Sequence, residues 1–123
     1  MSFIPCVETL WSGKVKTTNT EEFSAFIDVT PGRTYVVCVE LIAITGTSLT
    51  FDVETNCSGS AAGVGTEKIA DDAIAMTTAG TTKTFTLPAL TTGKMPASKL
   101  RLSVTGASIT TSTFNAFVVV RAT

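Results

Sequence analysis

Two carboxylates are the residues of this chain whose types and spacing come closest to a catalytic arrangement. Asp52 and Glu54 stand two positions apart in 50–55, so in a β-strand they share one face at a separation of about 7 Å. Carboxylate pairs at such distances carry out glycoside hydrolysis. Phe51 and Val53 alternate with them, so these apolar side chains lie on the opposite face of the strand, where they can pack into a core. We therefore expect Asp52 and Glu54 on the solvated face of an ordinary strand, with no catalytic role.

The other common catalytic and ligand-binding devices lack essential residues. The chain has no histidine, which excludes Ser/His/Asp and Cys/His nucleophile systems. The acidic pair Asp71-Asp72 lies in no spaced calcium loop, and no Lys-Ser or Lys-Thr follows the glycine-rich stretch 59–65 as a phosphate-binding loop requires. We predict no catalytic residues, no cofactor and no metal, and hence no enzyme.

The three cysteines fit a protein that folds in a reducing compartment. Cys6, Cys38 and Cys57 are an odd number at wide spacing, and no histidine is available to complete a zinc site. Cys38 lies in a dense apolar segment, so we predict a small buried apolar residue there. A Cys6–Cys57 disulfide is the less favoured alternative.

The charge content argues against nucleic acid and membranes as partners. Charged residues make up 15% of the chain, against roughly 25% in ordinary soluble domains, and the net charge is −1. Nucleic-acid binding needs a basic patch that displaces counterions, and no Lys/Arg run is present. No apolar run approaches the roughly 18 residues of a membrane span, and no basic amphipathic helix is visible.

Threonine and the apolar residues predict a β-protein. The chain holds 24 threonines among many valines, isoleucines, leucines and phenylalanines, and branched β-carbons favour a pleated sheet. Segments 50–55 and 99–105 alternate strictly between apolar and polar residues. Further strands are expected at 8–16, 23–29, 34–42, 82–87 and 112–121, with turns where Gly, Pro and Asn cluster. The prediction is an all-β antiparallel sandwich, jelly-roll-like, of about seven or eight strands.

Domain organisation follows from the length of 123 residues, which suits one domain. Residues 1–22 form an N-terminal arm and first strand within the same fold, and residues 23–123 form the sandwich. Segment 67–76 fits either one or two helical turns, with Ile69, Ala73 and Met76 on one face, or a bent edge strand that ends at Met76. We favour the strand.

Two segments are apolar on both faces, namely 34–42 and 112–121. One face of an antiparallel sandwich normally meets water, so a second apolar face needs a cover. That cover is either another part of the same chain or another subunit. The second reading predicts self-association.

The N-terminus 1–6 has no basic region and no long apolar region, so we expect no signal peptide and folding in the cytoplasm of the producing cell.

A set of hairpin motifs resembles small virion proteins of tailed bacteriophages. The motifs are Phe26-Ile27-Asp28-Val29-Thr30, then Thr45-Gly46-Thr47-Ser48 with Asp52-Val53, and finally Lys99-Leu100-Arg101 with Val104-Thr105-Gly106-Ala107-Ser108. The resemblance covers roughly 26–121. It departs at 57–60, where such proteins commonly carry Asp-Gly and Trp, so no loop contacts are transferred.

This resemblance implies a capsid decoration (cement) or minor head protein that sits on the capsid surface of the virion. The expected partners are the major capsid protein and further copies of the chain, as a homotrimer. Interface hot spots favour aromatic residues. The candidate contact residues are Phe3, Ile4 and Trp11 near the N-terminus and Phe117 and Val119 on the last strand, although each could equally belong to the core. The alternatives are a carbohydrate-binding or host-attachment sandwich on a phage appendage and a tail component.

Overall fold

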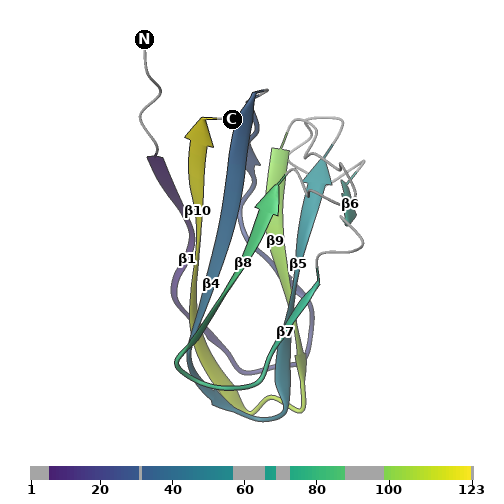
Figure 1. Ribbon diagram of the computed structural model, residues 1–123. Coiled ribbons are helices and arrows are strands. Elements are labelled where there is room, and N and C mark those ends of the chain that lie inside the picture. Colours follow the sequence, from purple (N-terminus) through teal and green to yellow (C-terminus); the bar gives the residue numbers. More distant parts are fainter. Residues whose placement is uncertain (1–5, 31, 57–65, 69–72, 88–98, 123) are drawn as a thin grey trace.

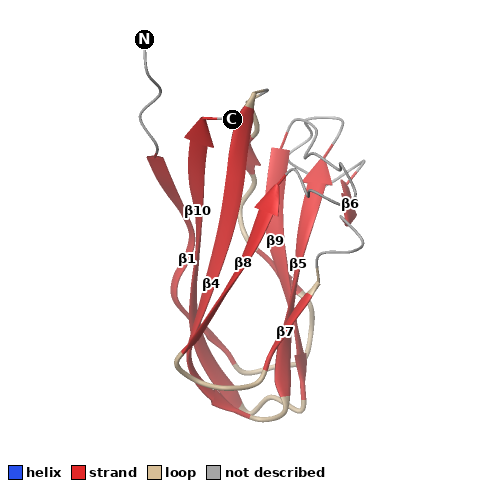
Figure 2. Ribbon diagram, in the orientation of Figure 1, coloured by secondary structure: helices blue, strands red, loops and turns tan. Residues whose placement is uncertain are grey.

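The chain folds as two packed β-sheets. The computed structural model describes residues 6–30, 32–56, 66–68, 73–87 and 99–122, and every regular element in these ranges is a strand (Figure 2). Consequently, none of the described residues belongs to a helix that could cross a membrane. The strands are β1 (Cys6–Lys16), β2 (Glu22–Phe23), β3 (Ile27–Asp28), β4 (Arg33–Thr45), β5 (Ser48–Asn56), β6 (Thr66–Lys68), β7 (Ile74–Met76), β8 (Thr81–Leu87), β9 (Lys99–Ala107) and β10 (Thr111–Ala122).

The strand order is that of a jelly roll. One sheet has the order β1-β10-β4-β8, and the other has β2-β9-β5-β6, with β3 also on β9 and β7 also on β5 (Figure 1). All pairs are antiparallel, and the first half of the chain pairs with the second half in reverse order. If β2/β3 and β6/β7 each count as one interrupted strand, eight strand positions result, as in a double-sheet jelly roll. The predicted fold class is confirmed.

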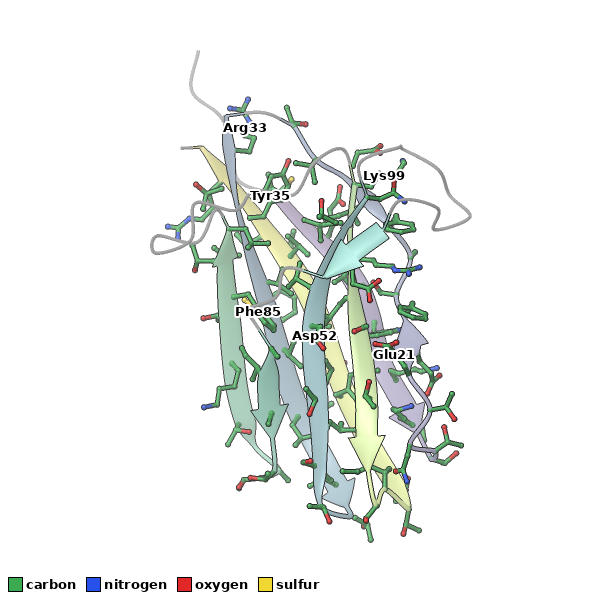
Figure 3. The ribbon with its side chains drawn as sticks, turned by 90° about the vertical axis from the view of Figure 1, so that its right-hand side faces the viewer. Glu21, Arg33, Tyr35, Asp52, Phe85 and Lys99 are labelled. Atoms are coloured by element: carbon green, nitrogen blue, oxygen red, sulfur yellow. The ribbon has the colours of Figure 1, made fainter. Side chains whose placement is uncertain are left out.

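The core lies between the sheets and follows from the period-2 alternation. Tyr35 of β4 points inward (Figure 3). Alternate residues after it, Val37, Val39 and Leu41, are also buried, and β5, β9 and β10 contribute alternate residues to the core in the same way. The hydroxyl of Tyr35 bonds to the backbone N–H and the carbonyl of Thr30, so the buried ring carries no unpaired polar group.

Two hairpin turns pack against each other at the end of the sandwich that carries the β4–β5 and β9–β10 connections. The Thr47 N–H donates to the Ala107 carbonyl at 3.1 Å, and the Thr110 N–H donates to the Thr45 carbonyl at 2.9 Å. Asn19, from the β1–β2 connection, joins them because its side chain accepts from the Ile109 N–H at 2.9 Å. The two turns and the connection therefore form one closed end.

An ionic cluster ties β1 to β2 across the same connection. The carboxylate of Glu22 binds Nζ of Lys14 at 3.0 Å and Nζ of Lys16 at 2.8 Å. Lys16 is buried, and its ammonium also donates to the Thr20 carbonyl. These hydrogen bonds, with Lys16 the stronger contributor, hold the pKa of Glu22 below its ordinary value. The buried ammonium is thus paired.

Two predicted segments differ in detail. The predicted strand 23–29 is two short strands, β2 and β3, which both pair with β9. Within 67–76, residues 67–68 belong to β6 and Ile74–Met76 form β7, which ends at Met76 as the predicted strand does, whereas Ala73 lies in no strand. Residues 69–72 lie outside the described residues.

Candidate protein-binding face

An apolar patch lies on the outside of the four-stranded sheet. The register aligns Val7, Val119 and Val36 in one row across β1, β10 and β4, and Phe117 and Cys38 in the next row. None of the five is in the core cluster. All except Val7 are half-buried, and Val7 is 63% exposed. We call these five residues the outer apolar face. Thr84 and Thr86 continue the two rows on β8.

A shallow groove of about 270 Å³ lies on this face beside β1. Its apolar wall consists of Val7, Trp11 and Phe117. Its polar groups are the carboxylate of Glu40, the amide of Asn115 and the hydroxyls of Thr9 and Ser12. The groove therefore offers apolar contact together with a few hydrogen-bonding groups.

Trp11 is fixed from behind by a chain of aromatic rings. Its ring meets Phe114 edge to face, at a centroid distance of 5.4 Å, and Phe114 meets Phe51 of the other sheet in the same way at 5.2 Å. Such pairs add to the stabilisation from burial alone. The indole packs against the core and is connected through Phe114 to the second sheet, so Trp11 holds this part of β1, and with it one border of the groove, in place.

A bulge in β1 shapes the end of the groove. The pairing of β1 with β10 shifts register between Trp11 and Lys14, and Gly13 in between has φ of +60°. A positive φ suits glycine at a bulge. The Gly13 N–H donates to the side-chain oxygen of Asn115 at 2.6 Å. This bond orients the amide and leaves its NH₂ group to face other partners.

Two of the five predicted contact residues, Phe117 and Val119, lie on this face, and a third, Trp11, borders its groove while its ring packs against the core. Trp11 and Phe117 line the same groove, and Val119 follows Phe117 by one outward position on β10. Phe3 and Ile4 lie outside the described residues.

Other members of the face were missed by sequence reasoning. Val7 and Asn115 gave no signal, because their roles depend on the pairing of β1 with β10. The prediction that Cys38 is a small buried apolar residue is wrong. Cys38 points outward between the inward residues Val37 and Val39 and is half-buried. Burial, and then the nearby Glu40 carboxylate, raise the pKa of the Cys38 thiol.

A second cluster on the outside of the other sheet is internally satisfied. Nε of Arg101 donates to Glu54 at 2.8 Å, and the guanidinium lies 4.0 Å from the ring centre of Phe23 and 4.6 Å from that of Phe26. The expectation that Glu54 faces solvent is wrong, because Glu54 is only 4% exposed. Since the ion pair and the stacking use these groups, the cluster is a structural element of the fold.

Comparisons with known proteins identify the fold. No family model and no curated protein matches this sequence. Among solved structures, the chain is similar to a chain in the structure of infectious bursal disease virus Gt strain, with a TM-score of 0.56 and 13% sequence identity. The match covers 98% of this chain and 33% of the viral chain, so this chain spans about a third of that chain's length. At this identity, the likeness shows that the two share a fold.

Proposed function

We propose that this protein is a non-enzymatic structural component of a virion that binds its neighbours through the outer apolar face. The observation that carries the proposal is the aligned row of Val7, Val119 and Val36, with Phe117 beside it, on the outside of a jelly roll. The fold likeness to a chain in a virus structure supports a role in a virion. Nothing in that likeness favours a tailed phage.

The physical reason is the free energy gained when such a face leaves water. Burial of apolar surface contributes roughly 25 cal/mol per Å², and stable interfaces bury about 1,600 Å² in total. Phe117 and Trp11 are the types of residue that dominate binding energy when they are anchored in a well-packed patch. The low charge of the chain suits association that depends little on salt.

The finer form of this proposal is a decoration or cement protein on the outer surface of a phage capsid. Its partners are the major capsid protein and further copies of the chain itself. The hairpin motifs around Gly46 and Gly106 are the support for this finer form, and the structure accounts for those motifs as turn chemistry.

The test is co-sedimentation of the purified chain with capsids from the virus that carries its gene. Wild type should pellet with capsids, and Phe117→Glu should lose at least about tenfold in affinity, because a carboxylate would be desolvated in the interface. Ala79→Glu, in the exposed β7–β8 turn, is the matched control and should bind like wild type. Failure of wild type to pellet, or equal binding by Phe117→Glu, would remove the proposal.

A carbohydrate-binding domain is the second candidate. The observation that favours it is the groove itself, where Trp11 and Phe117 stand beside the hydrogen-bonding groups of Glu40 and Asn115. Aromatic rings accept the apolar face of a sugar, and the carboxylate and amide accept and donate to hydroxyls. A glycan array decides this point: binding that is lost in Trp11→Ala and Asn115→Ala would favour this role over the structural one.

A further inference from the structure

The first half of β1 is an open sheet edge. Cys6, Val7, Glu8 and Thr9 pair in unbroken register with Val120–Phe117 of β10. In the described part of the chain no strand lies on their other side, because β1 ends the strand order, as the left margin of the molecule in Figure 1 shows. An edge strand presents unpaired N–H and C=O groups, which form a template for another strand.

Within the segment Cys6–Thr9 the one charged side chain is that of Glu8, and the segment lies before the bulge. Val7 is the most exposed large apolar side chain of the described residues. The opposite edge of the same sheet, β8, carries exposed Lys83, Thr84 and Thr86 instead. Lysines and polar residues are common means of blocking an edge. Of the two edges, β1 is the one suited to accept a strand.

We infer that the segment Cys6–Thr9 pairs with the same segment of a second copy, antiparallel about a two-fold axis near Val7. Two identical edge strands that run antiparallel are self-complementary in their hydrogen-bond pattern. A second copy of the strand can therefore pair with the free backbone N–H and C=O groups of the edge. The row Val7–Val119–Val36 would continue into the same row of the second copy and bury the exposed valines against each other. This continuity of the outer apolar face argues for a second copy as the occupant.

Charge disfavours one neighbouring register, and the apolar row favours the axis near Val7. An axis through Glu8 would place two carboxylates opposite each other, which is destabilising. An axis through Val7 places valine opposite valine and Glu8 opposite Cys6. The inference rests on the self-association in the proposed function, and it replaces the homotrimer of the sequence-based expectation with a two-fold dimer.

The test is sedimentation equilibrium of the full chain from micromolar to millimolar concentration. Wild type should dimerise, and Val7→Lys should raise the dimer dissociation constant on the order of tenfold or more, because lysine at an edge opposes pairing. Val15→Lys is the matched control. Val15 lies on the same strand and is 56% exposed, but it follows the bulge and lies outside the pairing segment. It should dimerise like wild type.

The exposed thiol of Cys6 supplies a second readout that does not depend on a variant that weakens association. In the proposed register the two Cys6 residues lie diagonally across the axis, at a Cα separation of roughly 7–8 Å. A short bismaleimide should therefore link two wild-type chains into a covalent dimer. Cys6→Ser should not form this product.

The possible failures separate this inference from the proposed function. A strict monomer, a trimer, or equal weakening by Val7→Lys and Val15→Lys would overturn the edge contact. A wild-type chain that fails the sedimentation test but still pellets with capsids would leave the virion role standing. A dimer that ignores capsids would support the edge contact and remove the virion role.

Discussion

Gly46 is the residue whose replacement the fold tolerates least at the closed end. Its φ of +143° belongs to a region used almost only by glycine, and a Cβ there would stand 2.4 Å from the Ser108 carbonyl oxygen. Backbone of the neighbouring turn blocks this space, so no side-chain rotation relieves the clash. The Thr-Gly-Thr motif is therefore a packing requirement between two hairpins.

We predict that Gly46→Ala lowers the free energy of unfolding by about 3 kcal/mol, from backbone strain and overpacking together. Gly80→Ala is the control. Gly80 also has a positive φ, +84°, but nothing lies within 4 Å of its Cβ position, so the cost should be only about 1 kcal/mol. Urea unfolding measures both values. Equal losses in the two variants would show that the contact between the turns does not matter.

The buried ion pair of Glu54 and Arg101 allows a second residue-level prediction. Removing one partner of a buried pair leaves an uncompensated charge, which costs more than the pair itself contributes. Arg101→Met should lower the free energy of unfolding by about 3 kcal/mol. The double variant Glu54→Gln with Arg101→Met should recover part of this loss, as measured by urea unfolding. A double variant as unstable as the sum of the single variants would contradict the coupling.

At the scale of elements, the cluster of Lys14, Lys16 and Glu22 makes the attachment of β1 to β2 depend on pH. The folded-state pKa of Glu22 is below its ordinary value of 4.5, chiefly because of the hydrogen bond from Lys16 and then that from Lys14. A carboxylate with a lowered pKa stabilises the fold above its unfolded-state pKa, and this contribution is lost as the pH falls through the folded-state pKa.

Glu22→Gln should therefore be less stable than wild type above about pH 4.5. Below that pH the difference should shrink, because wild type also loses the charge. Urea unfolding of both proteins across a pH series measures this convergence. The other carboxylates contribute equally to the unfolding free energy of both proteins, so their contribution cancels in the difference. If the difference in unfolding free energy stayed constant down to the lowest pH measured, the contacts of Lys14 and Lys16 would contribute equally whether or not Glu22 is charged.

Strand prediction succeeded where one face of a segment is apolar and the other polar. The alternation in 50–55 and 99–105 marks the centres of β5 and β9, and the inward residues Phe51, Val53 and Leu100 are fully buried. The same pattern could not show what covers the polar face. Glu54 looks like a surface residue in sequence, yet Arg101 of the neighbouring strand pairs with it. The alternation in a strand shows on which face of the sheet a side chain lies. Whether that side chain is buried depends on the side chains of the neighbouring strands.

The candidate face was predictable in part, from its aromatic residues and from the second apolar face of 34–42 and 112–121. Trp11 and Phe117 were chosen because aromatic residues dominate interfaces, and the structure places both in one groove. Val7 could not be chosen, since its importance comes from a pairing with Val119, more than a hundred residues away in sequence. Local strand propensity does not show which residues of two distant strands lie opposite each other, because that register is set when the whole sheet forms.

At the scale of the whole molecule, the reverse-order pairing makes the first strand depend on the last. β1 pairs with β10 alone in the four-stranded sheet, and β10 also pairs with β4. The candidate face therefore exists only when both ends of the chain are in place. A function carried by this face is coupled to global folding rather than to any single hairpin.

This topology predicts slow and cooperative refolding. Non-local strand pairing must close large loops before it gains stability, and all-β sandwiches dominated by such pairs refold in roughly milliseconds to seconds. Trp11 is the single tryptophan, and its ring packs on Phe114 of β10. Its fluorescence therefore reports the contact between the first and last strands. In stopped-flow refolding from urea, this signal and the far-UV circular dichroism should recover with the same rate constant, because the sheet and the β1–β10 contact form in one transition. Recovery of the dichroism well before the fluorescence would instead mean that β1 docks on a sheet already formed without it.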